Sequence, residues 1–144
     1  MTYKIKILRY LLVFVGLTIG IPVLFAVLKS LFGLDLGSGG ASIIPVMIAA
    51  MVEGQGFAKI EKRRPENKEA WNISLRLAGL GLIPTFILSA IFFAATPSLH
   101  VYATNLLFTI GLIAIVGAVF VLLSRIFFSL GAKGVVRASE KARK

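Results

Sequence analysis

The sequence contains no cysteine and a single histidine, His100, among its 144 residues. Disulfide bonds are therefore impossible, and a structural zinc site, which needs several His or Cys ligands, is not expected within one chain. The sequence also lacks a nucleotide-binding loop and a nucleophile–histidine–acid set. We therefore expect no metal, no cofactor and no enzymatic activity.

Charged residues are scarce as well. They make up 15% of the chain, against about 25% in soluble domains, while hydrophobic residues reach 58%. This combination excludes intrinsic disorder and an ordinary soluble enzyme. The formal net charge is +10, but no folded binding module accompanies it, so we expect no nucleic-acid partner. The composition predicts an integral membrane protein, whose first partner is the lipid bilayer.

Four hydrophobic stretches predict an all-α fold. A hydrocarbon core about 30 Å thick needs about 20 helical residues. Stretches of this length occur at residues 10–28, 77–95 and 102–123, and a weaker one occurs at 39–58. A re-entrant segment is the competing interpretation of the weaker stretch. Because the links are short, we expect one membrane domain, residues 1–144, folded as an antiparallel up-down four-helix transmembrane bundle.

The placement of positive charge predicts the orientation. Both ends of the chain and the link between the second and third stretches are basic, whereas the first link contains only Lys29. With both termini in the cytoplasm, every basic residue except Lys29 lies on the cytoplasmic side, as the positive-inside rule requires. Residues 125–144 then form a basic cytoplasmic tail. At helical spacing, the tail presents a stripe that we expect to contact anionic headgroups, formed by Lys133, Arg137, Lys141 and Lys144. A solvated tail is the alternative.

The second stretch carries the one segment with unusual chemistry. It ends in Glu53-Gly54-Gln55-Gly56, with Glu53 about one helical turn from the cytoplasmic end. A carboxylate at this depth is costly unless it is hydrated, protonated or paired. Arg76 lies at a similar depth in the next, antiparallel stretch, so we expect a Glu53–Arg76 ion pair. The alternatives are a proton- or ligand-binding site at Glu53, Gln55 and Arg76, or simple exposure of Glu53 to headgroup water.

Small residues indicate where helices pack closely, because apolar side chains gain little by leaving lipid. Gly16 and Gly20 form a G-x-x-x-G pair in the first stretch, and Gly79 and Gly81 form a smooth patch in the third. We expect these glycines to pack the chain's own bundle. A homodimer seam at Gly16 and Gly20 is the alternative.

Residues 43–58 read I-I-P-V-M-I-A-A-M-V-E-G-Q-G-F-A, and residues 63–71 read R-R-P-E-N-K-E-A-W. The region 38–71 resembles the signature region of an uncharacterised family of small bacterial four-span inner-membrane proteins, known only by a locus-tag name. The resemblance implies a multi-pass protein of the bacterial inner membrane, and it implies no activity.

These features favour a non-enzymatic accessory, regulatory or immunity-type membrane protein that acts through helix contacts. Its partner would be a second copy of the chain or another membrane protein. The alternative is a small oligomeric transporter or channel that uses Glu53. Small multidrug transporters also have four spans and one membrane carboxylate, but theirs lies in the first span, and residues 10–28 contain no acid.

Overall fold

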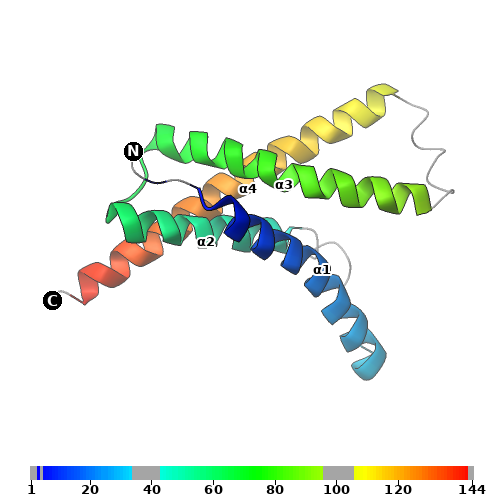
Figure 1. The fold of residues 1–144 in the computed structure, drawn as a ribbon, viewed down its shortest axis with the longest axis horizontal. Helices are drawn as coiled ribbons and strands as arrows, with labels where there is room; N and C mark the ends of the chain where they lie inside the picture. The colour runs from blue at the N-terminus through cyan, green and yellow to red at the C-terminus, as the bar shows by residue number, and fades with distance from the viewer. Residues whose placement is uncertain (1–2, 4, 34–42, 96–105, 143–144) are drawn as a thin grey trace.

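The computed structural model describes most of the chain, namely residues 3, 5–33, 43–95 and 106–142. Within these residues the regular structure is entirely α-helical. Figure 1 shows four helices, α1 (Ile7–Phe32), α2 (Ile44–Glu61), α3 (Asn67–Ala95) and α4 (Leu106–Lys141). The predicted all-α fold is therefore confirmed for the described residues.

Three of these helices, α1, α3 and α4, are long and apolar enough to cross a membrane. The second predicted stretch differs from the others. Its helix, α2, begins at Ile44 and continues to Glu61, and it is not among the candidate spans. The charged residues Glu53, Lys59 and Glu61 lower the hydropathy of its C-terminal half. Residues 39–42 of the predicted stretch lie outside the described residues.

The ends of α1 and α2 have local causes. Gly33 follows α1 with a left-handed backbone (φ 66°), and its N–H donates to the carbonyl of Lys29 at 3.0 Å. Lys62 caps α2 in the same left-handed conformation. Arg63 then makes two hydrogen bonds to the Glu69 carboxylate, at 2.7 and 2.8 Å, which tie the short link to the first turn of α3.

The helix α4 begins at Leu106 and continues without interruption to Lys141. The described part of the predicted basic tail is therefore a helical extension of the last apolar stretch. Lys133, Arg137 and Lys141 lie on its final turns, whereas Lys144 lies outside the described residues.

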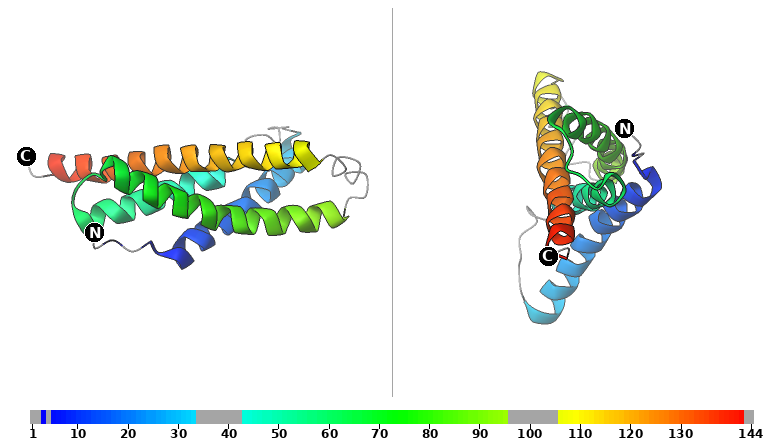
Figure 2. Two further views of the ribbon diagram at one scale, coloured as in Figure 1. Left: turned by 90° about the horizontal axis from the view of Figure 1, so that it is seen from above. Right: turned by 90° about the vertical axis from the view of Figure 1, so that its left-hand side faces the viewer.

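The helix α2 is the centre of the bundle. It packs most extensively against α4 and less extensively against α1 (Figure 2), while α3 packs mainly against α4. Small residues allow this central position, because Ala49, Ala50, Gly54, Gly56 and Ala58 of α2 are all buried. The neighbouring helices thus accommodate the polar composition of α2.

The helix α1 packs against the bundle only through its N-terminal half. Its buried residues are Tyr10 and Phe14, and the rest of the helix projects away from α2, α3 and α4 (Figure 1). Phe14 contacts Phe120 of α4 edge-on, with ring centroids 6.3 Å apart. Two neighbouring aromatic side chains therefore anchor α1 near its start.

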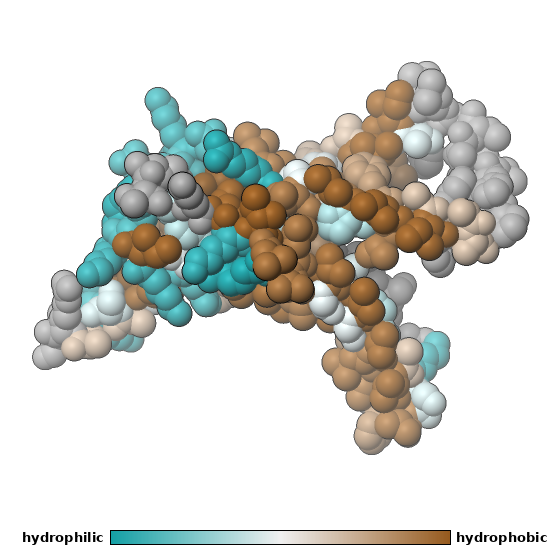
Figure 3. Space-filling model, viewed as in Figure 1, coloured by the Kyte–Doolittle hydropathy of each residue, from teal (hydrophilic) through white to brown (hydrophobic). Residues whose placement is uncertain are grey.

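The surface is divided by polarity. Figure 3 shows hydrophilic residues gathered at the end of the molecule where α2 and α4 end and α3 begins, and hydrophobic residues over the remaining helices. Large apolar side chains are exposed along α1, α3 and α4. Soluble monomers rarely expose apolar surface on this scale, so the distribution supports a membrane protein.

Candidate functional site

The carboxylate of Glu53 is the centre of a buried polar cluster. Its side chain has no solvent-exposed surface, although it carries a charge into the middle of the bundle. Nε of Arg9 donates a hydrogen bond to its Oε1 at 2.9 Å, and Nη2 of Arg9 lies 2.7 Å from the same oxygen. The hydroxyl of Tyr3 donates to Oε2. Both carboxylate oxygens are therefore engaged. Both partners come from residues 3–9, the N-terminal segment, which includes the first turn of α1.

The glycines beside Glu53 make room for this cluster. A Cβ atom at Gly56 would collide with the guanidinium of Arg9, whose Cζ lies 3.3 Å from that position. A Cβ atom at Gly54 would collide with the backbone of Phe128 in α4. Gln55 between them is half-buried and makes no hydrogen bond to a described residue. In the segment Glu53-Gly54-Gln55-Gly56, Glu53 thus holds a charge, Gly56 leaves room for Arg9 and Gly54 leaves room for α4.

Tyr3 connects the start of the chain to α2 at two points. Its hydroxyl holds Glu53, and its backbone N–H donates to Oε1 of Glu61 at 2.9 Å. Burial, followed by the hydrogen bond to Glu53 and the charge of that residue, raises the pKa of the Tyr3 hydroxyl above its ordinary value. Tyr3 therefore remains a protonated donor to the carboxylate at neutral pH. Its ring also meets Phe57 edge-on at 5.4 Å.

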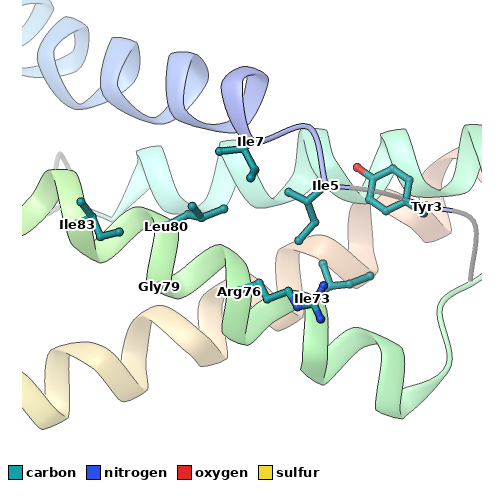
Figure 4. A pocket seen from close by; sticks show the side chains of 8 residues that line it. All are labelled: Tyr3, Ile5, Ile7, Ile73, Arg76, Gly79, Leu80 and Ile83. Carbon is teal, nitrogen blue, oxygen red and sulfur yellow. The ribbon is translucent and has the colours of Figure 1, made fainter.

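The partner of Glu53 is Arg9, and not Arg76 as expected from the sequence. Arg76 is exposed on α3, where it lines a pocket together with Tyr3 (Figure 4), and it makes no ion pair with Glu53. Arg76 was expected because it lies at a similar membrane depth to Glu53 in a neighbouring, antiparallel helix. Arg9 also lies in a helix that packs against α2. From the sequence, however, Arg9 precedes the first apolar stretch and was interpreted only as one of the basic residues that set the orientation.

The glycines expected to pack the bundle do so at one position only. Nothing lies within 4 Å of a Cβ atom built on Gly16, Gly20 or Gly79. At Gly81 such an atom would lie 2.9 Å from Oη of Tyr10 and 3.4 Å from the ring of Phe120. The close packing by Gly81 is therefore real, whereas Gly16 and Gly20 face away from the chain's own helices. The homodimer seam at these two residues stays a prediction.

Three further buried hydroxyl groups belong to the interior: Tyr10, Ser74 and Ser124, one from each of α1, α3 and α4. None has a hydrogen-bond partner within the part of the chain that the structure describes. Buried hydroxyls are normally satisfied, so each marks a place where a polar ligand or water would gain a hydrogen bond. The interior is accordingly not purely apolar.

No three His, Cys, Asp or Glu side chains come together among the residues of known placement, so the structure offers no candidate metal centre there. The cluster of Tyr3, Arg9 and Glu53 can hold charge and attach the N-terminal segment to α2. The chain matches no protein-family model, no curated protein and no solved structure. The geometry of this cluster and the surface around it are therefore the features that bear on function.

Proposed function

We propose that the chain is a multi-pass membrane protein that acts without catalysis, in an accessory, regulatory or immunity role, through contacts of its apolar helices. One observation carries the proposal: the buried Glu53 carboxylate is fully occupied by Arg9 and Tyr3. An occupied carboxylate serves as a clamp between the N-terminal segment and α2. A transported proton or cation would first have to displace these partners.

The exposed surface of α1 supports the proposed mode of action. Only two residues of this 26-residue helix are buried, so most of its surface would face lipid or another helix. Gly16 and Gly20 lie on open parts of this surface, where a second helix could approach closely. The partner in the proposal is a helix of another membrane protein or of a second copy of this chain.

The proposal includes an orientation with both termini in the cytoplasm and with all four helices across a bacterial inner membrane. Figure 3 shows the hydrophilic end of the molecule, and the basic residues of the sequence that lie where α2 and α4 end and α3 begins support this orientation through the positive-inside rule. The 18 residues of α2 span about 27 Å, slightly less than the hydrocarbon core. Because α2 packs against α1 and α4, only part of its surface would meet lipid, and the large exposed hydrophobic side chains on that surface are Ile48, Met51 and Ile60.

Copurification after mild detergent extraction tests the proposed mode of action. We expect the full chain to retain a defined membrane-protein partner or a second copy, and Gly20→Leu to weaken that association. The variant should still fold, because no atom lies within 4 Å of a Cβ atom at this position. Lys141→Gln, a change on the far end of α4, is the control that should leave the association intact. A strictly monomeric chain without any retained protein would contradict the proposal.

A transporter or channel that uses Glu53 is the second candidate. The unpartnered hydroxyls of Tyr10, Ser74 and Ser124 favour it, since they share the bundle interior with a carboxylate. Proton flux into liposomes that contain only the purified chain decides between the two functions. A flux that disappears in Glu53→Gln would support transport, and the absence of flux above empty liposomes would support the accessory role.

A further inference from the structure

The N-terminal segment and α3 enclose a pocket of about 680 Å³ that the proposed function does not use. This volume lies within the range of about 300–1,000 Å³ that is typical of small-molecule sites. Figure 4 shows side chains entering it from both elements. The apolar ones include Ile5 and Ile7 from the N-terminal side and Leu80 and Ile83 from α3.

Arg76 is the one charged side chain among the described residues that line the pocket. It is exposed, and it makes no hydrogen bond or ion pair with any other residue whose position the structure gives. A guanidinium presents five N–H donors in a planar fork that matches a phosphate or carboxylate. The pocket therefore combines an apolar wall with one uncommitted anion-binding group.

The depth of Arg76 agrees with the position of lipid phosphates. Trp71, about 1.4 turns earlier in α3, belongs to a residue type that is enriched at the membrane–water interface, and the guanidinium of Arg125 lies 4.5 Å from the centroid of its ring. Arg76 lies about 7.5 Å further along the helix axis, by the helical rise of five residues. From there a long side chain can reach the interface while its pocket extends toward the hydrocarbon region.

We propose that this pocket binds one anionic phospholipid, with its phosphate on Arg76 and one acyl chain along Ile7, Leu80 and Ile83. Basic pockets between membrane helices are known sites for acidic lipid headgroups. Tyr3 forms part of the same wall while its hydroxyl holds Glu53. A bound lipid therefore packs against the segment that clamps the buried carboxylate, and it stabilises that segment.

Lipid titration of the full chain in mild non-ionic detergent, followed by native mass spectrometry, tests the assignment. Phosphatidylglycerol and phosphatidylcholine with identical chains are the two probes. We expect one phosphatidylglycerol to bind about fivefold more tightly than phosphatidylcholine, which corresponds to about 1 kcal/mol for one basic contact. Arg76→Gln should remove this preference, and Arg64→Gln, an equal loss of charge in the exposed link, should keep it.

A second variant separates binding from folding. Gly79 lines the pocket, and nothing lies within 4 Å of a Cβ atom there, so we expect Gly79→Leu to place its side chain in the pocket and still fold. It should lower the binding of both lipids severalfold, whereas Gly111→Leu, at an equally open position on α4, should not. Equal affinity of the native chain for the two lipids, or binding unchanged in Gly79→Leu, would overturn the proposal. Laurate, a fatty-acid anion without a phosphate group, is a third probe. Tight binding of laurate with no bound phospholipid would overturn the proposal as well.

Discussion

Gly54 of α2 lies against the main-chain carbonyl of Phe128 in α4, so that no side-chain atom separates the two backbones. The relationship is reciprocal, because Gly131 of α4 lies in the same way against the backbone of Met51 in α2. Each helix thus contributes one glycine to the contact. In each helix this glycine lies three residues after the residue that the other helix's glycine touches, as Gly54 follows Met51 and Gly131 follows Phe128. This crossing fixes the distance between α2 and α4 and keeps α2 at the centre of the bundle.

Replacing Gly54 by Ala should therefore destabilise the chain, although alanine is the better helix former. The added methyl group would meet the carbonyl of Phe128 and force the helices apart, at a cost of about 1–3 kcal/mol. Gly16→Ala is the matched control, because its methyl group meets nothing and should stabilise the helix by about 0.5–1 kcal/mol. Thermal unfolding in one detergent measures both. Equal shifts in the two variants would contradict the crossing.

The ion pair between Arg9 and Glu53 predicts that Arg9→Gln and Glu53→Gln lower the stability of the chain by different amounts. Arg9→Gln leaves a fully buried carboxylate without its cation, which costs about 3–5 kcal/mol when such a pair is broken. Glu53→Gln should cost less, because the Arg9 side chain is 36% exposed and can turn to water. The double variant should recover much of the loss seen in Arg9→Gln.

Arg76→Gln is the control for this cycle. Arg76 makes no hydrogen bond or ion pair with Glu53. The change in the free energy of unfolding caused by Arg76→Gln should therefore add to that caused by Glu53→Gln without coupling. The free energies of unfolding of all the variants can be compared in the same detergent without phospholipid, so that lipid bound at Arg76 does not contribute. A coupling between Arg76 and Glu53 as large as that between Arg9 and Glu53 would contradict the structure.

The helices that are uniformly apolar could be predicted from the sequence because hydropathy is a local property. The predicted stretches 10–28, 77–95 and 102–123 all correspond to helices of the structure, although α1 extends beyond both predicted limits, α3 begins earlier and α4 ends later. Residues 102–105 of the last stretch lie outside the described residues. The second stretch, 39–58, is harder to predict from hydropathy, because its polar residues are tolerated only through the helices that surround it. Enclosure by other helices is a tertiary property, and no pattern within α2 reveals it.

The candidate site was predicted in part. Glu53 stood out because a carboxylate in an apolar stretch needs a partner, and the structure supplies one. The identity of that partner depends on which face of each helix meets which neighbour, and the packing of the helices around α2 places Arg9 and not Arg76 beside Glu53. The contacts between helices also decide that Gly16 and Gly20 are open while Gly54, between α2 and α4, makes the closest contact.

The proposed crossing of the membrane by α2 predicts opposite accessibility for its two ends. The native chain has no cysteine, so a single introduced cysteine reports on one position. Ile43→Cys and Arg64→Cys lie on either side of α2, and both side chains replaced are exposed. We expect a membrane-impermeant thiol reagent added to intact cells to label the first variant and to label the second only after permeabilisation. Labelling of both under the same condition would indicate a re-entrant segment.

The hydrogen bond from Tyr3 to Glu53 predicts a specific loss of stability at alkaline pH. Burial, the hydrogen bond to Glu53 and the charge of Glu53 raise the pKa of Tyr3 in the folded chain above its ordinary value of 10.0. In the unfolded chain Tyr3 loses its proton near that ordinary value, while the folded chain retains it. The stabilisation is therefore complete below pH 10 and is lost progressively as the pH rises toward the folded-state pKa.

Tyr3→Phe separates this effect from the general action of alkali, because it removes the titrating hydroxyl and keeps the ring that contacts Phe57. At neutral pH the variant should be less stable than the native chain by about 1.5–3 kcal/mol, the usual contribution of a hydrogen bond to a charged group. Because only the native chain has the hydroxyl to lose, the difference in thermal unfolding temperature should narrow above pH 10. A difference that stays constant through that range would mean that Tyr3 does not hold the carboxylate, and Arg9 would then be its sole anchor.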